Sequence, residues 1–66
     1  MSIFDRIHAA AQEEKARWGV PMRRCYVGED EWDEVEFLLG KDRSVIIYGV
    51  TVFPDFSKQN GMEFTI

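Results

Sequence analysis

Apolar side chains near the start of the chain recur at the spacing of an amphipathic helix. They are Ile3, Phe4, Ile7, Ala11 and Trp18. Ser2 is suited to cap this helix, with Asp5 at the third position as an acidic variant of the capping box. Gly19 favours a helix C-terminus, and Pro21 disfavours helical geometry at the residue before it. The pattern predicts a helix over residues 3 to 17.

A second helical pattern covers residues 29 to 39. Trp32, Val35 and Leu39 fall on one helical face, and Leu38 lies beside them. Gly40 is suited to end the segment. We therefore expect a helix here, with Trp32 in the core.

Three other segments have the pattern of strands. Over residues 22 to 27, apolar Cys25 and Val27 alternate with the other side chains. Residues 45 to 53 hold two runs of β-favouring residues around Gly49, which predicts one central strand with a bulge or a close backbone approach at the glycine. Residues 62 to 66 alternate after a loop that ends in a turn-prone Asn-Gly pair, so we expect them to form a hairpin with the central strand.

These elements predict one α+β domain over residues 1 to 66, in the order α-β-α-β-β. Two helices would pack on one face of a three-stranded, mostly antiparallel sheet. Such a sheet has two edges, and a domain this small covers neither easily. We therefore expect a homodimer or higher oligomer.

The composition indicates a folded cytoplasmic protein. Of 66 residues, 45% are hydrophobic and 30% are charged, which is the balance of a globular domain. The single cysteine, Cys25, cannot close a disulfide within the chain, which favours a reducing compartment. No segment has the length and apolarity of a membrane span, and the first residues lack the pattern of a secretory signal, so we expect no membrane association.

Six carboxylates crowd the second predicted helix. They are Glu29, Asp30, Glu31, Asp33, Glu34 and Glu36. One interpretation is a solvated face stabilised by the helix dipole. The other is a partner-binding surface in which Asp30, Glu31, Asp33 and Glu34, largely off the apolar face, steer a basic partner. The run lacks the spacing of a calcium loop, so no metal site is expected.

Nothing in the chain predicts catalysis. Cys25 falls on the apolar side of its strand, where a buried thiol has a raised pKa and low reactivity. His8 shares a helical stripe with apolar residues, and one histidine with one cysteine is too few ligands for zinc. The five glycines are scattered, so no phosphate-binding loop is present. We expect no enzyme activity and no cofactor.

The basic residues are few, and the net charge of −4 disfavours direct binding of nucleic acid. Arg23 and Arg24 are adjacent, with the aromatic side chains of Trp18 and Tyr26 nearby in sequence. They could form a small anion site or offset the acidic helix that follows.

Nine aromatic side chains are too many for one small core, so some of them should be exposed. Phe53 and Phe56 lie at a strand end and in the loop after it, where exposed aromatic side chains commonly anchor interfaces. We therefore include them among the expected partner-binding residues, with the alternative that Phe56 folds back onto the core.

The chain from Arg24 to Ile66 resembles small uncharacterised proteins of tailed bacteriophages. The resemblance lies in Tyr26-Val27-Gly28, Trp32, Leu38-Leu39-Gly40, Tyr48-Gly49-Val50-Thr51-Val52 and Gly61-Met62-Glu63-Phe64. Thr51 stands where those relatives would have proline. The resemblance implies a virus-encoded accessory protein in the host cytoplasm or the virion, and it carries over no site residue.

Together these observations predict a non-catalytic accessory protein that modulates or inhibits a host or defence protein by protein-protein contact. Two alternatives stay open. One is a self-associating structural or virion component, and the other is a small nucleic-acid-binding protein that uses Arg23 and Arg24.

Overall fold

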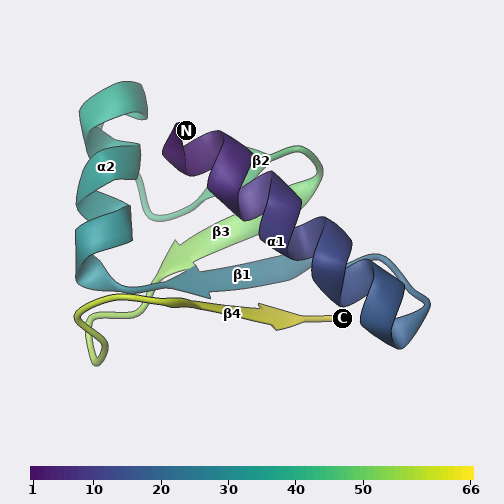
Figure 1. Cartoon of the computed structure of the whole chain (residues 1–66). Helices are drawn as coiled ribbons and strands as arrows, with labels where there is room; N and C mark the ends of the chain where they lie inside the picture. Colours follow the sequence, from purple (N-terminus) through teal and green to yellow (C-terminus); the bar gives the residue numbers. More distant parts are fainter.

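The computed structural model describes residues 1–66 and shows two helices packed on a four-stranded sheet (Figure 1). The elements are, in chain order, α1 (Ile3–Trp18), β1 (Arg24–Val27), α2 (Glu29–Leu39), β2 (Val45–Ile47), β3 (Val50–Pro54) and β4 (Met62–Thr65). The predicted α+β class is confirmed.

The ends of α1 follow from the capping residues in the sequence. The backbone N–H of Asp5 donates to Ser2 Oγ at 3.2 Å, so Ser2 is the N-cap as predicted. Gly19 adopts a left-handed conformation with φ of 77°, and its N–H donates to the Lys15 carbonyl at 2.8 Å. The helix ends at Trp18, one residue later than predicted.

The sheet differs from the predicted one. Its strand order is β2-β3-β1-β4; β1 and β3 run parallel, and the other two pairs are antiparallel. The expectation of a three-stranded, mostly antiparallel sheet is therefore wrong in strand number and in the pairing at its centre. Parallel pairing of β1 and β3 needs a long crossover connection, and the segment from α2 through β2 provides it.

The segment around Gly49 is a hairpin instead of one bulged strand. Ile47 pairs with Val50, and the two residues between them have positive φ angles of 49° at Tyr48 and 81° at Gly49. Positive φ at both positions is typical of the type I′ turn that joins tight hairpins. The Tyr48 ring packs on His8 of α1, with ring centroids 4.3 Å apart. This contact holds a side chain at a position that usually favours Asn or Gly.

The last strand pairs with β1 and not with the central hairpin. Cys25 lies opposite Phe64 in the β1–β4 register. The expected hairpin between residues 62–66 and the 45–53 segment is wrong because β2 and β1 already occupy both edges of β3.

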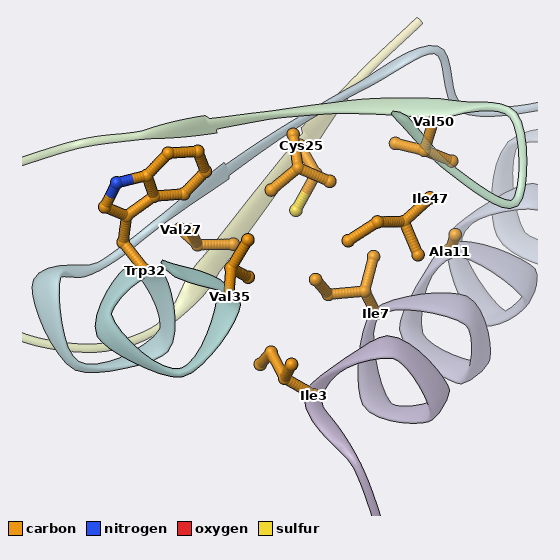
Figure 2. Packing of buried hydrophobic residues seen from close by; sticks show 10 residues of the cluster. Ile3, Ile7, Ala11, Cys25, Val27, Trp32, Val35, Ile47 and Val50 are labelled. Atoms are coloured by element: carbon orange, nitrogen blue, oxygen red, sulfur yellow. The ribbon is translucent and has the colours of Figure 1, made fainter. Parts of the chain in front are cut away.

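Both helices cover the same face of the sheet, as predicted, and the core lies between the two layers (Figure 2). The buried cluster is Ile3, Ile7, Ala11, Cys25, Val27, Trp32, Val35, Ile47, Val50 and Val52. Trp32 is 2% exposed, which confirms its predicted place in the core.

Two residues assigned to apolar helix faces lie outside the core. Trp18 is 62% exposed, and its Nε1 donates to Glu14 at 2.8 Å. Leu39 is also more than half exposed. In each helix the buried positions end before the last turn, at Ala11 in α1 and at Val35 in α2.

Candidate functional site

The first turn of α2 is capped by backbone groups from the loop over residues 55–61. The N-cap is Gly28, which has no side chain to accept a hydrogen bond. Instead, the N–H of Glu29 donates to the Lys58 carbonyl at 3.0 Å and that of Asp30 donates to the Gln59 carbonyl at 2.9 Å. The loop therefore satisfies donors that an N-cap side chain would otherwise bind.

The loop reaches this position because Gly28 has no Cβ. A Cβ at residue 28 would lie 2.5 Å from the Asn60 Cα, which is closer than such atoms approach. Gly28 is itself buried, and its N–H donates to the Gly61 carbonyl at 2.9 Å. The glycine thus permits a close approach between two backbone segments.

Two of the predicted partner-binding carboxylates hold this loop. Asp30 Oδ1 accepts a hydrogen bond from Gln59 Nε2 at 2.6 Å, and both carboxylate oxygens of Glu31 lie within 3.2 Å of the Gly61 nitrogen, which donates to them. Glu31 is only 6% exposed. The expectation that all four carboxylates face solvent is therefore wrong for Glu31, because the loop covers it.

Arg6 joins α1 to the acidic helix. Its guanidinium lies 3.6 Å from Glu31 Oε2 through Nη2 and 3.1 Å from Glu34 Oε2 through Nη1. The Glu34 side chain remains about half exposed, so this contact is a surface ion pair of small energetic value. Glu34 still presents charge to solvent.

Asp33 is the predicted carboxylate that the fold leaves free. It is exposed and takes part in none of the side-chain hydrogen bonds or ion pairs of the chain. Of the four carboxylates considered from the sequence, Asp33 and Glu34 are thus the two that are exposed and do not bind the loop over residues 55–61.

The most exposed aromatic residue is Phe37, which the sequence reasoning missed. It is 88% exposed and lies one helical turn after Asp33 and Glu34. The signal was present, because position 37 does not fall on the face shared by Trp32 and Val35. We call Asp33, Glu34 and Phe37 the α2 outer face.

The two aromatic residues singled out from the sequence have different environments. Phe56 is 68% exposed in the turn after β3, so it does not fold back onto the core. Phe53 is partly buried and stacks on Tyr26, with ring centroids 5.4 Å apart and an angle of 20° between the planes. Near Phe56, hydrogen bonds from the Ser57 hydroxyl and backbone N–H lower the pKa of Asp55.

The residues considered for catalysis are packed away from solvent or serve the fold. Burial raises the pKa of the Cys25 thiol to about 12, so it stays protonated at neutral pH. His8 packs on Tyr48. No three His, Cys, Asp or Glu side chains gather closely enough to hold a metal ion.

Arg23 and Arg24 line a hollow of about 480 Å³ at the start of β1. The other lining residues are Pro21, Met22, Gly49 and Thr51. Neither arginine forms an ion pair, and the cation that meets the acidic helix is Arg6. The two arginines therefore do not pair with α2, which removes one of the two interpretations of their position.

Neither helix of the chain is long and apolar enough to cross a membrane. Comparison with protein-family models, with curated proteins and with solved structures finds no match for this chain. The likeness to bacteriophage proteins therefore stays a prediction from the sequence.

Proposed function

We propose that this chain is a non-catalytic binding module that docks on a protein partner through the α2 outer face. The observation that carries the proposal is the 88% exposure of Phe37 beside two available carboxylates. Fully burying a phenylalanine side chain contributes about 1.5 to 3 kcal/mol. A partner that covers Phe37 would gain this energy, whereas the isolated chain leaves it unused.

The charge distribution supports the chemistry of the partner. α2 holds six carboxylates and no cation, so the rest of the chain has a net charge of +2 against −4 for the whole. Such a concentration of charge on one element steers a basic surface toward it. The partner that fits has an apolar pocket for Phe37 with Lys or Arg at its rim.

The resemblance to tailed-bacteriophage proteins suggests the setting of this contact. A virus-encoded accessory protein would meet a host or defence protein in the host cytoplasm and modulate or inhibit it by occupying a basic site. This setting is part of the proposal and rests on the sequence resemblance alone.

The test is affinity purification of the whole chain from the producing cells, with Phe37→Ser and Phe56→Ser compared. Phe56 is a matched control because it is also exposed but lies in the loop after β3. We expect one stoichiometric partner that is retained by Phe56→Ser and lost with Phe37→Ser. A partner retained by Phe37→Ser and lost with Phe56→Ser would move the docking site to the loop.

The electrostatic part of the proposal has its own measurement. Asp33→Asn should slow association of the purified pair, and the wild-type association rate should fall as salt rises. If the association rate responds to neither change, the carboxylates of α2 form a solvated face and have no role in binding.

The edge strand β2 supports a second candidate function, self-association as a structural or virion component. β2 lies at the edge of the sheet and exposes 74% of Ile46. An exposed edge strand with an apolar side chain can pair with a second copy. Light scattering across the micromolar range should then show an oligomer that Ile46→Lys dissociates, and a monomer throughout would exclude this candidate.

A further inference from the structure

The face of the sheet opposite the two helices is covered by no other part of the chain (Figure 1). Because side chains alternate along a strand, the residues between the buried positions point to this side. The open sheet face comprises Arg24, Tyr26, Ile46, Thr51, Phe53, Glu63 and Thr65.

Two aromatic rings form a platform at the centre of the open sheet face. Tyr26 on β1 and Phe53 on β3 are register partners on neighbouring strands, and their rings are stacked. Both side chains are partly exposed, so parts of the two rings meet solvent. Each ring has one face against the other ring, and an outer face of such a pair can stack with a nucleobase irrespective of sequence.

Cations without partners lie at one end of this platform. Arg24 is the register partner of Thr51. It precedes Tyr26 by two residues in β1 and lies on the same face, so the two residues are about 7 Å apart along the strand. With Arg23 it lines the hollow beside Thr51, and neither arginine is ion-paired. At the other side of Tyr26, Glu63 is paired with Lys58 at 3.1 Å, so its charge is compensated.

We propose that the open sheet face binds single-stranded nucleic acid. A base would extend the stack on an outer face of the Tyr26–Phe53 pair, and an adjoining phosphate would enter the hollow beside Arg23 and Arg24. The platform and the unpaired cations are thus placed as neighbouring parts of one site. A duplex fits poorly, because its bases are stacked on each other and leave no free face for the two rings.

The acidic character of the whole chain does not oppose this site. All of the excess negative charge belongs to α2, which packs on the other face of the sheet (Figure 2). Salt screens exposed charges beyond about 8 Å at physiological ionic strength, and the sheet separates α2 from the open sheet face. The face that a strand would meet carries the unpaired Arg24 instead, and the unpaired Arg23 lines the adjoining hollow.

The test uses the whole chain and fluorescence anisotropy with labelled oligothymidylate and oligouridylate of about ten nucleotides at about 50 mM salt. We expect binding of one or both single strands, weaker binding of a duplex of the same length, and weaker binding of a free nucleotide. Absence of binding to both strands would overturn the proposal. Equal affinity for the duplex, or for the free nucleotide, would also overturn it.

Variants then assign the binding to the platform. Tyr26→Leu and Phe53→Leu keep an apolar side chain on the sheet and should each weaken binding by about 5-fold or more. The matched control is Phe37→Leu, the same change on the opposite layer, which should bind like the wild type. Circular dichroism melts identify any variant that fails to fold. If a variant does not fold, an oligonucleotide with a photoreactive base is bound to the wild type instead, and a cross-link to residue 26 or 53 is the expected result.

The phosphate contact has a separate readout. Arg24→Gln should reduce the slope of log affinity against log salt by about 0.7, the value for one contact with a single strand. An unchanged slope, or unchanged affinity in both aromatic variants, would overturn the assignment. The open sheet face could instead bind a second copy of the chain. An oligomer of the wild type that Tyr26→Leu dissociates would show this and would overturn the proposal. The outcome for nucleic acid does not depend on the proposed docking of a protein partner, because only that docking requires Phe37.

Discussion

The buried carboxylate of Glu31 accepts the backbone N–H of Gly61 from both of its oxygens, at 3.1 and 3.2 Å. A residue of the acidic helix is thereby tied to the residue before β4, thirty positions later in the chain. The same carboxylate lies beside Arg6 of α1, so it links three parts of the fold.

Removing this carboxylate should destabilise the protein. Glu31→Ala leaves the partly buried Gly61 N–H without its side-chain acceptor, which should cost about 1 kcal/mol, the lower end of the range for a buried unsatisfied group. Asp33→Ala, on the same helix but exposed, should change the free energy of unfolding by no more than about 0.5 kcal/mol. Urea unfolding compares the two, and equal midpoints would contradict the structural role of Glu31.

A methyl group at residue 28 should displace the loop over residues 55–61. Gly28 has a φ of −70°, which alanine adopts freely, so the effect of Gly28→Ala comes from the clash with Asn60 alone. Overpacking of this kind costs about 1 to 3 kcal/mol. Amide hydrogen exchange should accelerate at Glu29 and Asp30, because their N–H groups donate to backbone carbonyls of the loop. Asp33→Ala, at an exposed position of the same helix that does not touch the loop, should leave those two amides protected.

Truncation should lower the stability of the protein strongly at one aromatic residue of α2 and hardly at all at another. Trp32→Ala should lower stability by about 3 to 5 kcal/mol, because it opens a cavity in the core. Phe37→Ala removes a side chain that is almost fully exposed and should change stability by less than about 0.5 kcal/mol. If the thermal melts of Trp32→Ala and the wild type coincide, the described orientation of α2 is incorrect.

Alkaline pH should destabilise the fold through Cys25. The thiol pKa is raised from 9.0 to about 12 by burial, so between these values the unfolded chain releases a proton that the folded chain retains. Stability is therefore intact below pH 9 and falls above it, by about 1.4 kcal/mol per pH unit. Cys25→Ala lacks this group, so the difference between the two proteins in urea unfolding at pH 8 and at pH 10.5 isolates it. A difference that does not change with pH would show that the thiol ionises equally in both states.

The two helices were predictable because their signals are local. Ser2 and Gly19 fix the ends of α1, and the apolar positions of α2 lie three residues apart at Trp32 and Val35. The order of the strands was not predictable in this way. The strand order depends on which segment pairs with each free edge of the sheet. In addition, the residues around Gly49 are compatible with a bulge as well as with the hairpin turn that Gly49 forms.

The candidate site was predictable only in part. Asp33 and Phe56 are exposed, as their positions in the sequence suggested. The burial of Glu31 could not be foreseen, since it is produced by a loop about thirty residues away. Phe37 could have been identified by asking which aromatic residues lie off the apolar face of α2.

The pairing of β1 has a consequence for the order of folding events. Cys25 meets Val52 and Phe64, residues far along the chain, whereas Ile47 meets Val50 across a two-residue turn. Local hairpins close in microseconds, and distant pairings wait for loop closure that is entropically costly. We therefore expect the β2–β3 hairpin to form early in folding and β1 to be inserted beside it later. In refolding kinetics, Gly49→Ala should slow folding, while Phe64→Ala in β4 should mainly accelerate unfolding.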